Sequence, residues 1–178
     1  SISAGENGNN VTQGSTTKEN DTDTVIKSKD SSTASSNTVT IDADEGKTVN
    51  VTLDNVTINV DEGYEHGYDP NAYKTAVSVT GSGNTNIELN GNNTLTSGYG
   101  HAGLEHNKTD DSGTLTIQDE KNDDGSAKGS ASDTTGSLTA NGGIDGAGIG
   151  GGALGTGDVT IEGNVTIENA QGGAGAAG

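Results

Sequence analysis

The side chains best suited to recognition chemistry are concentrated in one stretch of the chain. All four Tyr and all three His lie between residues 64 and 106, and the sequence has no Phe or Trp. Tyrosine rings stack on sugar faces and their hydroxyl groups reach sugar oxygens, while neighbouring carboxylates accept hydrogen bonds from sugar hydroxyls. We therefore expect a glycan-binding site made of Tyr64, His66, Tyr68, Asp69, Tyr73, Tyr99, His101, Glu105 and His106.

The spacing of these residues predicts how they are arranged. Tyr64 and Tyr99 each follow a short apolar segment by a few residues, so both are expected at the same edge of neighbouring strands. A binding role predicts that Tyr68 and Tyr99 are exposed and roughly coplanar. In the structural alternative, the rings pack inward and hold a long insertion against the core.

Acidic clusters suggest a bound cation. Carboxylate oxygens are the ligands that calcium prefers, although no EF-hand loop occurs. Clusters of this kind are otherwise solvated corners of the fold. The His spacing matches no recognised zinc motif. Calcium is thus the expected cofactor, with candidate ligands Asp110, Asp111, Asp119, Glu120, Asp123 and Asp124.

Catalysis is the weaker alternative. The chain has no Cys nucleophile, no Gly-x-Ser-x-Gly elbow and no Arg. Lys74 and Lys108 flank the Tyr/His stretch, and one of them would have to be buried to act as the base of a polysaccharide lyase. A hydrolase would need two positioned carboxylates. A non-catalytic protein is favoured, with a polysaccharide lyase or hydrolase as the alternative.

Composition restricts the partners. The chain has 26 acidic and 8 basic residues and a net charge of −18. Binding to nucleic acid requires a basic patch, so nucleic acid is not an expected partner. The sequence has no long apolar run, so membrane insertion is not expected. The acidity fits cation binding or a hydrated cell-surface layer.

Apolar residues alternate with polar residues from Asn37 onward, as in Val49-Asn50-Val51-Thr52-Leu53. This pattern predicts β-strands with one buried face. Residues 1–36 are mostly Ser, Thr, Asn, Asp and Gly, and we expect a polar linker or an N-terminal cap there.

A Gly-rich phrase recurs and suggests a repeat. It begins at Gly146 and again at Gly173, an offset of 27 residues. Leu53, Leu89 and Ile117 occupy similar positions in strand-like phrases, as does Ile161. Their unequal spacing is explained by two corner insertions, 61–72 and 119–135. We predict an all-β fold over residues 37–178, a right-handed parallel β-helix (solenoid) with rungs of about 27 residues, truncated at its C-terminal rung. A β-sandwich is the alternative.

The phrase at 146–152, followed by Gly-Asp-Val-Thr-Ile-Glu-Gly-Asn-Val-Thr-Ile at 157–167, resembles the Gly-rich repeats of Gram-positive bacterial surface proteins. It also resembles a polysaccharide-lyase-like β-helix family that acts as a carbohydrate-binding domain. The resemblance covers residues 37–178. It implies a secreted bacterial protein, extracellular or on the cell surface, that binds polysaccharide without cleaving it.

Two functions of different class follow from these patterns. The first is a carbohydrate-binding or adhesive module, an adhesin. The second is a structural stalk or filament segment, in which exposed strand edges at an open end permit end-to-end self-association.

Overall fold

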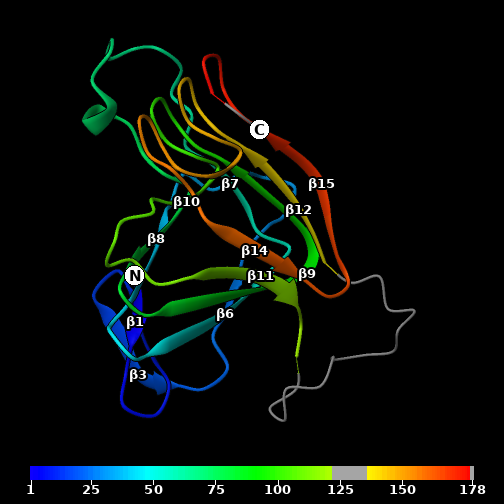
Figure 1. Cartoon of the computed structure of the whole chain (residues 1–178). Coiled ribbons are helices and arrows are strands. Elements are labelled where there is room, and N and C mark those ends of the chain that lie inside the picture. Colours follow the sequence, from blue (N-terminus) through cyan, green and yellow to red (C-terminus); the bar gives the residue numbers. More distant parts are fainter. Residues whose placement is uncertain (122–135, 177–178) are drawn as a thin grey trace.

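The fold is seen in a computed structural model that describes residues 1–121 and 136–176 (Figure 1). These residues form fifteen strands and one short 3-10 helix, so the chain is all-β as the sequence predicts. The elements are β1 (Ile2–Ala4), β2 (Asn9–Gln13), β3 (Thr16–Asp21), β4 (Val25–Lys27), β5 (Val39–Ala43), β6 (Thr48–Asp54), β7 (Thr57–Asn59), η1 (Pro70–Ala72), β8 (Val77–Gly81), β9 (Asn84–Thr96), β10 (Leu104–His106), β11 (Leu115–Asp119), β12 (Gly136–Asn141), β13 (Ile149–Gly150), β14 (Val159–Glu162) and β15 (Val165–Gln171).

The first sheet has seven strands in the order β13-β10-β8-β5-β1-β2-β3. Its strands are parallel from β13 to β1, but β2 pairs antiparallel with both β1 and β3. This sheet is therefore mixed.

The second sheet has eight strands, and the long strand β9 organises it. The first half of β9 pairs with β6 and β11, and its second half pairs with β7 and β12. Strand β4 pairs with β6, β14 with β11, and β15 with β12. All of these pairings are parallel.

The prediction of a right-handed parallel β-helix with rungs of about 27 residues is wrong. The strands form one mixed seven-stranded sheet and one eight-stranded sheet, and the chain distance between paired strands is not constant. Val39 pairs with Val77, Val77 with Leu104, and Leu104 with Ile149, which are steps of 38, 27 and 45 residues. Alternation in sequence shows which face of a strand is buried, but it does not determine the sheet to which the strand belongs.

Both sheets contribute to one apolar core. Alternate residues such as Val51 on β6, Ile87 on β9 and Ile117 on β11 are buried, as are Ile41 and Leu104 of the first sheet. The β-branched and leucine side chains suit a half-buried pleated surface. No aromatic residue belongs to this core cluster, so the rings between residues 64 and 106 lie elsewhere.

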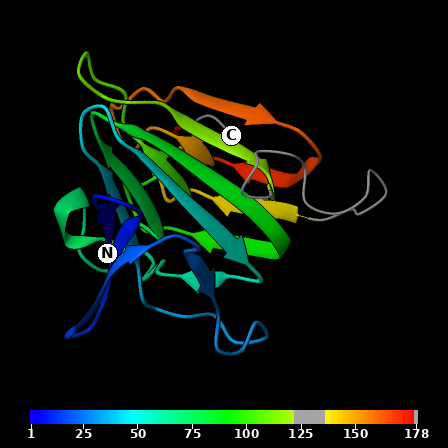
Figure 2. The ribbon, with the colours of Figure 1, turned by 90° about the horizontal axis from the view of Figure 1, so that it is seen from below.

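Residues 1–36, expected to be a linker or a cap, include the four strands β1 to β4. Ile2 on β1 is buried in the core, and β1 pairs in parallel with β5. The N-terminal strands (blue) and β14 (orange) lie at opposite ends of the molecule (Figure 2).

Candidate functional site: a tyrosine cluster

The candidate site is formed by two loops and one short strand. The loop between β7 and β8, residues 60–76, contains η1 and carries Tyr64, Tyr68 and Tyr73. The turn between β9 and β10, residues 97–103, carries Tyr99. The longer loop extends at the upper left of Figure 1. Strand pairing of β8 with β10 places the ends of these two loops side by side.

The four tyrosine rings form one cluster. Ring centroids are 5.0 Å apart for Tyr64 and Tyr68, 5.6 Å for Tyr64 and Tyr99, and 5.8 Å for Tyr68 and Tyr99. Tyr73 lies 5.4 Å from Tyr99, and the imidazole of His66 lies 5.5 Å from Tyr73. Most of these pairs are edge-to-face, an arrangement favoured by the quadrupoles of the rings.

The cluster has a buried half and an exposed half. Tyr73 and Tyr99 are only 6% and 7% exposed, whereas Tyr64 is 44% and Tyr68 is 80% exposed. The two buried rings connect the long loop to the body of the protein, while the exposed rings present apolar surface to solvent. The exposed rings fit the binding role expected from the sequence. The buried rings fit the structural alternative, in which they hold the insertion against the core.

The expectation that Tyr68 and Tyr99 would be exposed and coplanar is wrong. Tyr99 is buried and the planes of the two rings meet at 76°. The turn that carries Tyr99 also carries buried glycines, and it packs so closely on the segment after β12 that a Cβ on Gly143 would collide with the carbonyl oxygen of Gly98. The ring of Tyr99 is buried in this region, with its hydroxyl on Asp145. The two exposed rings are instead those of Tyr64 and Tyr68. Their planes meet at 80°, so they do not form a flat surface.

Hydrogen bonds fix the two buried rings. The hydroxyl of Tyr73 accepts from the backbone N–H of His66 at 2.8 Å and donates to the carbonyl of Gly67 at 3.3 Å. The hydroxyl of Tyr99 donates to Oδ2 of Asp145 at 3.4 Å. The exposed rings thus pack against Tyr99, which forms with Tyr73 a pair of rings whose orientation is fixed by hydrogen bonds.

The environment of two of the phenols, Tyr64 and Tyr99, raises their pKa values. Crowding by the neighbouring rings excludes water from Tyr64, and with the hydrogen bond to Tyr68 this raises its pKa above the usual 10.0. Desolvation and the nearby carboxylate of Asp145 raise the pKa of Tyr99. Both effects disfavour the phenolate forms of Tyr64 and Tyr99.

Carboxylates lie in the same loop as the exposed rings. Glu62 lies 3.4 Å from Nζ of Lys74 and 3.8 Å from Nε2 of His66. Asp69 is exposed and its Oδ1 accepts from the backbone N–H of Asn71. The loop thus carries hydrogen-bond acceptors as well as aromatic rings, and Lys74 and His66 supply donors.

Glu105 is buried and connects three segments. Its Oε2 accepts from the backbone N–H of Ala102 at 3.0 Å and lies 3.0 Å from Nδ1 of His101. Its Oε1 accepts from Nδ2 of Asn107 at 3.2 Å, and Asn107 Oδ1 accepts from the backbone N–H of Gly152. Glu105 and His101 therefore hold the turn that carries Tyr99.

His106 is separate from the rings. It is buried, with Nε2 3.0 Å from the carbonyl oxygen of Gly113 and Nδ1 3.3 Å from that of Val79. Its two partners are backbone groups of β8 and of the segment before β11. The side chain joins adjacent strands and does not face the tyrosine cluster.

The predicted calcium ligands are dispersed. Asp110 and Asp111 lie in an exposed turn, Asp119 is buried at the end of β11, and its Oδ1 accepts from the backbone N–H of Glu120. Within residues 1–121 and 136–176, no group of three or more His, Asp or Glu side chains could hold a metal ion. The other two predicted ligands, Asp123 and Asp124, lie outside the described residues.

Asp145 is a site residue that the sequence did not indicate. It lies 46 residues after Tyr99 and has a left-handed backbone conformation with φ of 65°. The segment that carries Asp145 lies close to the Tyr99 turn because it contains glycines. A Cβ on Gly146, for example, would collide with the carbonyl oxygen of His101. The Gly-rich phrase was the only available signal, and it gave no indication of a partner for Tyr99.

Comparison with known proteins provides no relative. The chain matches no protein-family model, no curated protein and no solved structure. In the part of the chain that the structure describes, no helix has the length and apolar character needed to cross a bilayer.

Proposed function

We propose that this protein is an extracellular carbohydrate-binding or adhesive module of a bacterial surface protein, without catalytic activity. The observation that carries the proposal is the tyrosine cluster, in which Tyr68 is 80% exposed and rests edge-on against the buried Tyr99. Large exposed aromatic rings on an otherwise aromatic-free chain mark a recognition surface. The resemblance to Gly-rich bacterial surface repeats agrees with this function.

The ligand class follows from the charges. A net charge of −18 repels polyanions, and Glu62, Glu65 and Asp69 lie in the same exposed loop as Tyr64 and Tyr68. An uncharged polysaccharide can place a sugar face against Tyr68 and donate its hydroxyls to these carboxylates. The proposal is therefore a neutral glycan.

The test is affinity electrophoresis through gels containing galactomannan, xyloglucan or mixed-linkage β-glucan, with polygalacturonate as the charged comparison. We expect retardation by at least one neutral polysaccharide. Tyr68→Ala should weaken the interaction about tenfold, and Tyr68→Phe should retain most of it, because the ring face makes the contact. Leu154→Ala is the matched control, since Leu154 is fully exposed and lies on another segment.

Calcium is included in the same test. Each gel is run with calcium chloride and with a chelator. Retardation that disappears in the chelator would support the calcium expected from the acidic sequence. If none of the polysaccharides retards the wild-type protein under either condition, the proposed function is wrong.

A second function, a structural segment that associates end to end, is favoured by one observation. Strands β13, β14 and β15 are the outermost strands of their sheets, and among the described residues no strand pairs with their outer edges. Ile161 on β14 is 50% exposed, although it continues the row of Ile87 and Ile117. Sedimentation velocity tests this function: concentration-dependent association that Ile161→Lys abolishes would support it, and a monomer at all concentrations would contradict it.

A further inference from the structure

A polar groove lies on the outer face of the second sheet, away from the tyrosine cluster. Its volume is about 390 Å³. The floor consists of side chains from three adjacent strands, β6, β9 and β11. The turn between β3 and β4 forms one wall, and Lys121 lies at the other side.

The strand register arranges the floor in rows. Thr52, Glu88 and Gln118 are paired across β6, β9 and β11, and Asn50 is paired with Asn86 two residues away. These side chains point outward because the residues between them, such as Ile87, are buried in the core. Neighbouring strands are about 4.8 Å apart, so each row presents closely spaced polar groups.

Hydrogen bonds orient the floor before any ligand arrives. Glu88 accepts from Oγ1 of Thr52 at 3.4 Å and from Nε2 of Gln118 at 3.2 Å. Nδ2 of Asn86 donates to Oδ1 of Asn50 at 2.8 Å. Among the described residues, Nδ2 of Asn50 and Oδ1 of Asn86 take part in no hydrogen bond, so this pair of amides keeps one donor and one acceptor for a ligand.

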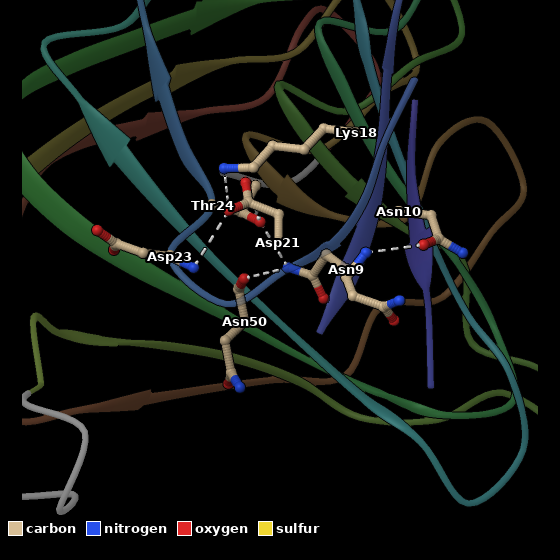
Figure 3. Close-up of polar contacts among 8 residues, drawn as sticks. Asn9, Asn10, Lys18, Asp21, Asp23, Thr24 and Asn50 are labelled. Atoms are coloured by element: carbon tan, nitrogen blue, oxygen red, sulfur yellow. Dashed lines mark hydrogen bonds and ion pairs between the residues drawn. The ribbon is translucent and has the colours of Figure 1, made fainter. Parts of the chain in front are cut away.

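The wall of the groove is fixed to the floor. Nδ2 of the buried Asn9 donates to Oγ1 of Thr24 at 3.0 Å and to the carbonyl oxygen of Asn50 at 2.7 Å (Figure 3). Thr24 in turn donates to Asp21, which also pairs with Lys18 at 2.7 Å. The turn containing Asp23 therefore has a defined position above β6.

We propose that this groove is a second glycan-binding site, which holds an uncharged, hydroxyl-rich chain through hydrogen bonds alone. The inference rests on the proposed function, because it assigns an additional surface to the same class of ligand. Amide groups that both donate and accept match sugar hydroxyls, which also do both. Glu88 retains acceptor capacity after its two hydrogen bonds.

The groove is unsuited to the other ligand classes. Among the residues that the structure describes, Val51 is the one apolar residue of the lining, and it is buried, so these residues offer no contact surface to an apolar ligand or side chain. An added peptide strand needs a free sheet edge, but β9 is paired on both sides. A cation would meet the ammonium group of Lys121, whose Nζ lies 2.7 Å from Oε1 of Gln118.

The experiment follows the side-chain amide resonances of Asn50, Asn86 and Gln118 by NMR while mannan-derived and xyloglucan-derived oligosaccharides are added. We expect these resonances to shift in the wild-type protein and also in Tyr68→Ala. Asn86→Ala and Glu88→Gln should each weaken the groove interaction about threefold to tenfold. Asn92→Ala, which removes an equivalent hydrogen bond to Ser137 elsewhere on the sheet, should have no effect.

The outcomes separate the two proposals. Shifts of the tyrosine ring resonances with unchanged groove amides would overturn the groove assignment and leave the proposed function standing. No shift at either surface would overturn both. Shifts of the groove amides with a Gly/Ser/Thr peptide, but not with the oligosaccharides, would also overturn the glycan assignment.

Discussion

The ring of Tyr68 stands edge-to-face against the ring of Tyr99, with centroids 5.8 Å apart and planes at 76°. One ring is almost fully exposed and the other is buried. The exposed ring is thus supported by a residue that is itself held by Asp145. A preorganised surface loses less side-chain freedom on binding than a mobile one, so this pair would favour binding at the proposed glycan site.

Removing the hydroxyl of Tyr99 tests this support. Tyr99→Phe retains the ring but loses the hydrogen bond to Asp145, and we expect the melting temperature to fall by about 2–4 °C. Asp145→Asn should have a smaller effect, because its amide oxygen can still accept. Differential scanning calorimetry measures both. A variant Tyr99→Phe as stable as the wild type would show that the hydroxyl does not anchor the cluster.

Alkaline pH should weaken the cluster. The pKa of Tyr99 is raised in the folded state by desolvation and by Asp145, relative to its ordinary value of 10.0. This stabilisation is complete below pH 10 and is lost as the pH rises toward the folded value. Chemical denaturation at increasing pH should show a steeper loss for the wild type than for Tyr99→Phe. Parallel curves would contradict the prediction.

Acid should loosen the wall of the groove. The hydrogen bond from Lys18 is the largest cause that lowers the pKa of Asp21 below 3.8, and bonds from Asp23 and Thr24 add to it. The corresponding stabilisation is present above pH 3.8 and is lost as the pH falls through the folded value.

A carboxyl NMR titration measures this pKa directly. In Lys18→Met the pKa of Asp21 should move back toward 3.8. Lys47→Met, which removes an exposed lysine elsewhere, is the control. An unchanged pKa in Lys18→Met would contradict the assigned cause.

One buried hydroxyl should be dispensable. Among the described residues, Oγ1 of Thr85 is buried without a hydrogen-bond partner, between Val49 and Leu115 in the strand register. Thr85→Val removes the desolvation cost while preserving shape, and we expect a gain of about 1 kcal/mol in the free energy of unfolding. Thr52→Val, which loses a bond to Glu88, should bring no gain. A destabilised Thr85→Val would show that the hydroxyl has a partner in solution.

Core packing on β9 should dominate stability. Leu89 is fully buried, so Leu89→Ala should lower the free energy of unfolding by about 2–5 kcal/mol. Ile161→Ala removes a similar side chain from a half-exposed position on β14 and should cost much less. Urea denaturation compares the two variants. Equal losses would contradict the assignment of these residues to core and edge.

Several strand pairings were accessible from the sequence. The phrases aligned on Leu53 and Leu89 are indeed neighbours, and Ile117 pairs with Ile161. The alignment of Leu89 with Ile117 was displaced by two residues, because Ile117 pairs with Ile87. A shift of two leaves the same face buried, so alternation cannot detect it.

The overall architecture was harder to predict from the sequence than these pairings. The antiparallel pairing of β2 and β3 depends on a turn in a polar segment that lacks apolar alternation, and the irregular steps between paired strands depend on loop lengths. The two-sheet arrangement therefore could not be read from a period of 27 residues.

The candidate site was predicted in part. Composition alone singled out the tyrosines, and the structure brings all four together. Their division into buried and exposed rings depends on Asp145, which is distant in sequence and meets Tyr99 only through close backbone packing at Gly146. Contacts between residues so far apart in the chain leave no local pattern in the sequence.

The proposed contact between Tyr68 and a neutral glycan can be observed at the rings themselves. The most direct measurement is the titration of the aromatic ring resonances of the wild-type protein with soluble neutral polysaccharide fragments, repeated in Tyr68→Ala. We expect saturable shifts at Tyr64 and Tyr68, and about tenfold weaker binding by the variant while its melting temperature is unchanged. Equal affinity of the two proteins, or no shift of these rings with any fragment, would contradict it.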